Sequence, residues 1–166
     1  MIGPMERLYK KLRLLGAHPL ATAWMRRFGW RLDRRVFRLS GGRFTLNGPQ
    51  VLLLRTTGRR SGLPRETPVI YIRDGEDLVI NSSDFGQRRP ADWPLNLAAE
   101  PRATVTVGRR SWPVRARALD EAEADRYWSR LVEVCPAHEV YRRRNGRRHV
   151  YLLSPAINGA EAKPFH

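Results

Sequence analysis

The sequence predicts an α+β protein in which a small antiparallel β-barrel is covered by a few helices. Two observations favour the barrel: short apolar or alternating runs follow one another from Val51 onward, and glycine-containing turns separate them. A third observation favours helices before and after these strands, because apolar residues recur every three or four positions before residue 42 and again after Asp120.

The N-terminal segment predicts two basic amphipathic helices. One apolar stripe runs from Met5 to Leu15 and is ended by Gly16. A second stripe advances four residues at a time, with arginines interleaved, through Leu20, Trp24, Phe28, Leu32 and Val36. Two interpretations stay open. The stripes pack on the barrel while the arginines face water, or the helices lie in a membrane interface.

Strands dominate beyond Gly41 and Gly42. The stretches 51–57 and 68–72 predict two strands joined by the turn 58–64. Asp74 and Gly75 then form a strong hairpin signal before a third strand around 78–80.

The second half of the chain predicts helices between further strands. A short helix is expected over 92–99, with Pro94 in its first turn. Two half-buried strands over 103–107 and 112–118 flank a turn at Gly108.

The remaining elements are a helix pair and a last strand. Asp120 and Glu123 resemble a capping box, and Pro136 stops the helix that follows. A helical turn or two is expected over 137–144, and a last strand over 149–153.

Length and composition bound the organisation of the chain. The 166 residues predict a basic helical segment over 1–42, a barrel over 43–155 and a tail over 156–166. One cysteine, Cys135, excludes an internal disulfide framework. No apolar run approaches the roughly 20 residues of a membrane span, and the N-terminus makes a poor signal peptide. We expect a cytoplasmic protein, or one peripheral at the inner face of the membrane.

Positive charge is concentrated toward the N-terminus. The formal net charge is +15, of which residues 1–50 contribute +9, residues 51–119 contribute +5 and residues 120–166 contribute +1. Such charge implies acidic partners, namely phosphorylated or carboxylated ligands, anionic lipid or nucleic acid. No aromatic stacking surface or RNA-binding motif is visible, so we do not expect nucleic acid to be the partner.

The turn between the first two strands is the most informative stretch. It carries Arg59, Arg60 and Ser61, and Arg65 follows closely. Its glycines let backbone amides approach an anion, and arginines offer forked donors to phosphate or carboxylate oxygens. A solvated basic hairpin is the alternative interpretation, because short basic turns are weak motifs.

These residues, together with later ones, resemble the deazaflavin-dependent nitroreductase family. The signature consists of Thr57-Gly58-Arg59-Arg60-Ser61-Gly62, then Pro64-Arg65, then Trp93-Pro94-Leu95-Asn96-Leu97. The likeness is continuous from Val51 to Val107, is weaker over 127–141, and is slight before Phe44.

The resemblance implies a split β-barrel, similar to barrels that bind flavin mononucleotide. Such a barrel would hold coenzyme F420, with flavin mononucleotide as the alternative cofactor. It would deliver hydride to an oxidised organic substrate in a reaction like that of a nitro, quinone or ene reductase. By the same resemblance, Arg59, Arg60, Ser61 and Arg65 would hold the phosphate and the acidic tail. The other cofactor-binding residues it implies are Glu66, Thr67, Pro68, Val69, Ile70, Asn81, Ser82, Ser83, Trp93, Asn96 and His138.

Two departures from the family pattern stand out. Asp84 occupies a position where relatives often carry lysine, so its charge would oppose an anionic cofactor unless it turns away or Arg88 and Arg89 compensate. The segment that supplies substrate-facing tyrosines offers Cys135, His138 and Tyr141 instead, and only Tyr141 matches. We therefore expect Tyr141 to be the catalytic hydroxyl donor and do not infer nitroreduction of a bicyclic drug.

Other chemistries find little support. The four histidines and one cysteine lack ligand spacing, so we expect no metal site. Cys135 completes an apolar helical stripe and is expected in the core. Ser61 has no sequence signature of a general base beside it, so serine hydrolysis has no support. Two alternatives to an enzyme stay open: a non-catalytic carrier of deazaflavin, flavin or haem, and a basic membrane-surface protein. A homodimer is suggested by family analogy alone.

Overall fold

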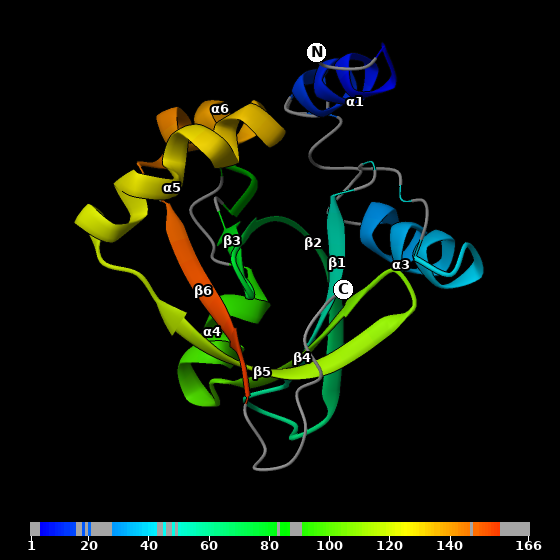
Figure 1. Cartoon of the computed structure of the whole chain (residues 1–166), viewed down its shortest axis with the longest axis vertical. Helices are drawn as coiled ribbons and strands as arrows, with labels where there is room; N and C mark the ends of the chain where they lie inside the picture. The colour runs from blue at the N-terminus through cyan, green and yellow to red at the C-terminus, as the bar shows by residue number, and fades with distance from the viewer. Residues whose placement is uncertain are drawn as a thin grey trace.

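The protein is an antiparallel β-barrel surrounded by helices (Figure 1). The structure is a computed structural model that describes residues 4–15, 18, 20, 28–42, 45, 48, 50–82, 84–86, 91–146 and 148–156. Six strands in these ranges close into a barrel in the order β1-β2-β3-β6-β5-β4. The α+β barrel expected from the sequence is confirmed.

The elements follow the chain order expected from the sequence. The strands are β1 Val51–Thr57, β2 Pro64–Asp74, β3 Asp77–Ser82, β4 Arg102–Val107, β5 Arg110–Ala118 and β6 His149–Pro155. The helices are α1 Pro4–Leu15, α3 Trp30–Leu39, α4 Asp92–Ala99, α5 Glu121–Val134 and α6 Ala137–Asn145, with a 3₁₀ turn, η2, over Asp84–Gly86. Residues 21–27, in which the second helical stripe was expected to run, lie outside the described residues.

Alternation along the strands fills the barrel with apolar side chains. Leu52 and Leu54 of β1 point inward and meet Ile80 of β3 and Val105 of β4 in one cluster. Burial of such side chains contributes about 1.5–3 kcal/mol each relative to exposure. Helix α4 belongs to the same cluster through Trp93 and Leu97, so it covers one opening of the barrel.

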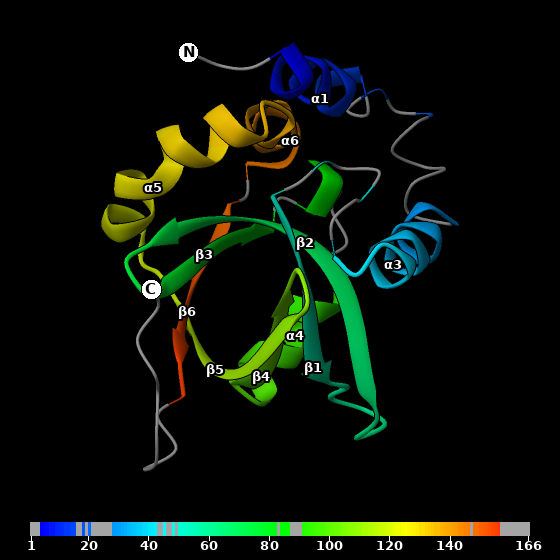
Figure 2. The same ribbon diagram turned by 45° about the vertical axis from the view of Figure 1, so that its right-hand side comes forward.

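Helix α5 covers the outer face of β2, β3 and β6. Its Leu131 packs with Ile72 and Val79, which point away from the barrel interior. The expected capping box is present: Glu123 N donates to Asp120 Oδ1 over 2.8 Å, and Glu123 Oε2 accepts from Asp120 N over 3.2 Å. Helix α6 follows directly and lies against η2, with α1 above it (Figure 2).

Helix α3 lies along β2 and reaches the β4–β5 turn. Its Phe37 is buried, and its Arg38 forms an ion pair with Glu66 of β2. The chain then turns through Gly42 at φ +76°, where an added Cβ would lie 2.2 Å from the carbonyl oxygen of Gly108. This backbone contact fixes the end of α3 on the barrel and admits only glycine.

Polar contacts connect helix α1 to the C-terminal end of α5. Arg13 Nη1 donates to the carbonyl of Val134, and Lys10 lies 3.9 Å from Glu133. None of the helices in the described ranges has the length and apolar character needed to cross a bilayer.

We expect Gly42→Ala to destabilise the fold more than Gly75→Ala does. Both glycines have positive φ, but nothing lies within 4 Å of a Cβ at Gly75. Gly75→Ala therefore measures left-handed strain alone, about 1–2 kcal/mol. Gly42→Ala adds a clash with backbone and should cost about 3 kcal/mol or more. Urea denaturation of the two variants measures the difference, and equal losses would show that the contact with Gly108 does not form.

Candidate functional site

The β1–β2 turn is a compact loop closed by its own backbone. Gly58 N donates to the carbonyl of Leu63 over 2.8 Å, and Gly62 N donates to the carbonyl of Gly58 over 2.8 Å. A Cβ at Gly58 would lie 2.9 Å from Ser61 Oγ and 3.0 Å from the Leu63 carbonyl oxygen, while Gly62 has φ +66°. The glycines of the signature are therefore required by the shape of the turn.

A buried amide from α4 anchors this turn. Asn96 Oδ1 accepts from the backbone N–H of Arg59 over 3.1 Å, and Asn96 Nδ2 donates to Thr56 Oγ1 over 3.1 Å. The side chain of Arg59 reaches the same helix, with Nη1 3.1 Å from Asp92 Oδ1. These bonds give Asn96 a role in positioning the turn, and the cofactor contact that the resemblance implies stays a prediction.

The side chains of the turn present positive charge to solvent. Arg60 and Arg65 are exposed, and Arg65 Nη2 lies 3.4 Å from Ser61 Oγ. Ser61 Oγ also accepts from the backbone N–H of Leu63 over 3.3 Å. The structure therefore brings the three predicted residues together at the start of β2, beside Arg59.

Alternation along β2 divides the next predicted residues between two faces. Val69 belongs to the barrel interior. Ile70 points outward and packs against Cys135, Ala137 and Tyr141 of the α5–α6 corner. Glu66 is engaged by Arg38 of α3. Thr67 and Pro68, between Glu66 and Val69 in the strand, are half-buried.

Trp93 is also a core residue. It is buried among the interior side chains of the barrel, and its ring meets that of Tyr151 edge-on at a centroid distance of 5.3 Å. Trp93 and Val69 thus stabilise the barrel that carries the site.

Asp84 turns into its own loop. The residue is 4% exposed, and its Oδ1 accepts from Ser82 Oγ over 2.8 Å and from the backbone N–H of Ala91 over 3.0 Å. Asp84 itself has φ +51°. The side chain thereby ties the end of β3 to the start of α4. The same contact engages the hydroxyl of Ser82. Ser83 lies outside the described residues.

Asn81 and His138 form a buried polar pair on the outer face of β3. Asn81 Nδ2 lies 3.2 Å from His138 Nδ1. An amide nitrogen only donates, so Nδ1 accepts and the neutral ring carries its proton on Nε2. The pKa of His138 falls from 6.5 to about 4, because burial disfavours the charged ring and the positive charge of Arg13 adds to this effect.

Tyr141 and Cys135 lie beside this pair in the α5–α6 corner. Tyr141 is buried against Ile70, Cys135 and Ala137. Burial raises the pKa of the Cys135 thiol, which suits a core residue and not a nucleophile. The expected core position of Cys135 is confirmed.

The predicted residues therefore fall into two groups joined by β2. Tyr71 pairs with Ile80, so Ile70 lies beside Asn81. Ile70 lies five positions after Arg65, which corresponds to about 17 Å of extended strand. A ligand that touches both groups must be elongated, with an anionic end at the turn.

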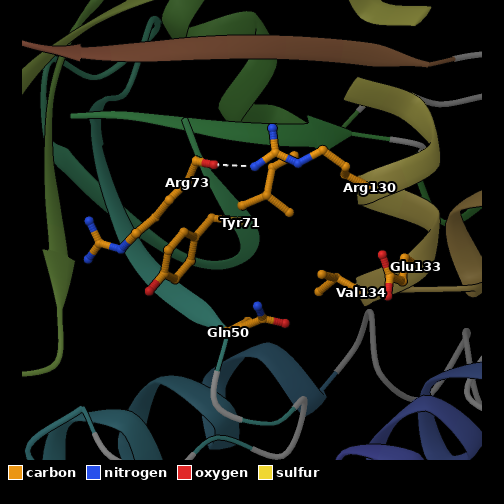
Figure 3. A pocket seen from close by; sticks show the side chains of 7 residues that line it. Gln50, Tyr71, Arg73, Arg130, Glu133 and Val134 are labelled. Carbon is orange, nitrogen blue, oxygen red and sulfur yellow. Dashed lines mark hydrogen bonds between the residues drawn. The ribbon is translucent and has the colours of Figure 1, made fainter. Parts of the chain in front are cut away.

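A separate cleft of about 330 Å³ lies where β2 extends beyond β1 (Figure 3). Its lining residues come from β2, α5 and the residue before β1; they are Gln50, Tyr71, Ile72, Arg73, Arg130, Glu133 and Val134. Arg130 Nη2 donates to the carbonyl of Arg73, as Figure 3 shows. None of the residues predicted from the sequence lines this cleft.

No metal site was expected from the sequence. Within the ranges that the structure describes, no group of three or more His, Cys, Asp or Glu side chains is placed to hold a metal ion.

We expect the stability of the protein to fall as pH decreases from 6.5 to 4, in part because of His138. Over this range the ring takes up a proton in the unfolded chain but not in the folded one. The free energy of unfolding should therefore drop by up to about 3 kcal/mol, and the drop should be absent above pH 6.5. Denaturation of wild type and His138→Gln as a function of pH isolates this contribution. His149→Gln, at an exposed position, is the control. Parallel curves for wild type and His138→Gln would contradict the assignment.

Comparisons with known proteins agree with the fold and with the resemblance. A family model described as F420H(2)-dependent quinone reductase matches residues 24–152. The chain is 34% identical over 103 residues to an F420H(2)-dependent quinone reductase of Mycobacterium tuberculosis, covering 59% of this chain and 69% of that protein. The match to the family model begins at residue 24, whereas the resemblance seen in the sequence is continuous only from Val51.

Two solved structures are similar to this one. An F420-H2 dependent reductase is 26% identical with a TM-score of 0.59, covering 63% of this chain and 94% of that one. A domain-swapped dimer is 25% identical with a TM-score of 0.61, covering 80% of this chain and 98% of that one. The signature turn, the split-barrel fold and the family match lead to one conclusion: this chain is an oxidoreductase of the F420H(2)-dependent quinone reductase family.

Proposed function

We propose that this chain binds reduced coenzyme F420 along β2 and uses it to reduce a quinone. The observation that carries the proposal is the pair of groups joined by β2: the exposed arginine turn at its start, and the corner formed by Ile70, Asn81, His138 and Tyr141 in its middle. Family membership supports both the cofactor and the quinone.

The donor set of the turn fits an anionic group. Arg60 and Arg65 are exposed and carry forked donors, which match phosphate and carboxylate oxygens. Asn96 and Asp92 hold the backbone and side chain of Arg59, so the turn is ordered before a ligand arrives. We assign Arg59, Arg60, Ser61 and Arg65 to the phosphate and acidic tail of the cofactor. The carboxylate of Asp84 accepts hydrogen bonds from Ser82 and Ala91, so its contacts lie within its own loop.

The corner in the middle of β2 fits an apolar ring with polar edges. Ile70 lies on the outer face of the strand among the apolar side chains of this corner, and the neutral His138 with Asn81 offers fixed polar groups. Burial of these groups excludes water and strengthens any hydrogen bond they make.

The chemistry requires a hydride and a proton. When bound, reduced F420 supplies the hydride. One quinone, one hydride and one proton give the hydroquinone, so a proton must reach the oxygen that gains charge. We assign the hydroxyl of Tyr141 as the donor to that oxygen. His138 and Asn81 then act by orienting the ligands.

A carrier without catalytic activity is the second candidate, since its binding contacts would be the same. The discriminating experiment is titration with reduced F420 and with flavin mononucleotide by fluorescence, followed by turnover with a water-soluble quinone. Binding of F420 without turnover would favour the carrier. A homodimer remains a prediction, and the similarity to a domain-swapped dimer supports testing it by sedimentation.

We expect Arg60→Gln with Arg65→Gln to weaken F420 binding at least tenfold. Charge-assisted hydrogen bonds contribute about 1.5–3 kcal/mol each, so loss of two exceeds one decade in Kd. Arg115→Gln with Arg126→Gln removes the same charge from exposed positions on β5 and α5 and is the control. Equal Kd values for the two double variants would exclude the turn as the anion clamp.

We expect Tyr141→Phe to reduce quinone turnover while F420 affinity is kept. The variant retains the ring that packs on Ile70 and removes only the hydroxyl. Proton donation typically contributes about 10²–10⁴-fold to a rate, whereas a packing role would mainly change stability. Steady-state rates and the free energy of unfolding are measured together. An unchanged kcat would exclude proton donation by Tyr141 and leave it a packing role.

A further inference from the structure

Helix α1 buries an arginine and exposes leucines. Leu8, Leu12 and Leu14 are 54%, 47% and 49% exposed, whereas Arg13 is 8% exposed. An ordinary surface helix shows the opposite arrangement, with its apolar stripe toward the core. The interpretation in which the apolar stripe packs on the barrel is therefore wrong for Leu8 and Leu12.

Contacts on the inner side of α1 enforce this orientation. Arg13 donates to the carbonyl of Val134 at the end of α5, and Lys10 lies 3.9 Å from Glu133. Tyr9 and Arg13 also pack closely on Gly48, where a Cβ would lie 3.1 Å from both side chains. These contacts leave the leucines on the outside of the helix.

Helix α3 repeats the pattern in part. Asp33 is 1% exposed, but Leu32 and Leu39 on the same helix are exposed. Of nine large hydrophobic side chains that are exposed in the described part of the chain, seven precede residue 40. The exposed apolar surface is therefore concentrated in the N-terminal helices and is not scattered over the molecule.

Positive charge accompanies the exposed leucines. On α1, Arg7 and Lys11 are exposed one position before Leu8 and Leu12. On α3, Arg31 and Arg35 are exposed beside Leu32. Residues 1–50 carry a net charge of +9, so two copies of this face would repel each other. A surface that is both apolar and anionic is the complementary partner.

We propose that this N-terminal face docks on the surface of an anionic lipid bilayer. The face consists of Leu8, Leu12 and Leu14 with Arg7 and Lys11 on α1. The leucines enter the boundary between headgroups and acyl chains, and the basic side chains pair with lipid phosphates. In both views α1 lies at the top of the molecule (Figures 1 and 2), and its leucines are exposed. The docking does not depend on the proposed reductase activity.

The test is co-sedimentation of the full chain with lipid vesicles, without F420 or quinone. We expect binding to vesicles of phosphatidylcholine and phosphatidylglycerol in equal amounts, little binding to phosphatidylcholine alone, and weakening by salt. Leu8→Gln with Leu12→Gln should lower the partition coefficient about tenfold or more, while Leu95→Gln, at an exposed position on α4, should not. Arg7→Gln with Lys11→Gln should lower it similarly, by about fivefold per charge.

Three results would overturn the proposal. Wild-type protein that stays in the supernatant with anionic vesicles at low salt excludes docking. Leucine variants that sediment like wild type place the contact elsewhere. A leucine variant that keeps vesicle binding but changes molecular mass in sedimentation velocity shows that the face joins two copies. Melting curves by circular dichroism establish that each variant is folded, which is expected because the substituted side chains are exposed.

Discussion

The proposed site depends on the register and the two-residue alternation of β2. The strand begins at the arginine turn, passes the Asn81 and His138 pair at Ile70, and ends at the cleft beside α5. A slip of one residue would exchange Val69 with Ile70 and put the corner residue into the barrel interior. Pairing with β1 up to Ile70 and with β3 from Tyr71 prevents such a slip.

Local chemistry made the turn and the strands predictable. Gly58 and Gly62 are needed by the loop itself, and Asp74-Gly75 is a hairpin signal wherever it occurs. The contacts of Asn96 and Trp93 were not predictable in this way, because each is decided by a partner distant in sequence. Asn96 bonds Thr56 across 40 positions, and Trp93 meets Tyr151. A resemblance transfers positions near a ligand, but it does not say which of them touch it.

The N-terminal helices illustrate a second limit of sequence patterns. A period of 3.6 residues shows which side chains share a helix face, but not which face points inward. On α1 the inward face is decided by a contact with Val134. The carbonyl of Val134 at the end of α5 needs a hydrogen-bond donor, and Arg13 provides it. Satisfying that helix end stabilises the corner carrying His138 and Tyr141, and it turns the leucines of α1 toward solvent. One polar contact thus serves the site and creates the exposed face.

The same arginine bears on which side chain can release a proton. Burial and the charge of Arg13 lower the pKa of His138 to about 4, so the ring is neutral at physiological pH. With Nδ1 engaged by Asn81, the ring can donate a hydrogen bond through Nε2, but it has no additional proton to give. Reduction of a quinone nevertheless consumes one proton. The hydroxyl of Tyr141 is the donor that we propose for this proton, and His138 is better suited to fix the position of what binds beside it.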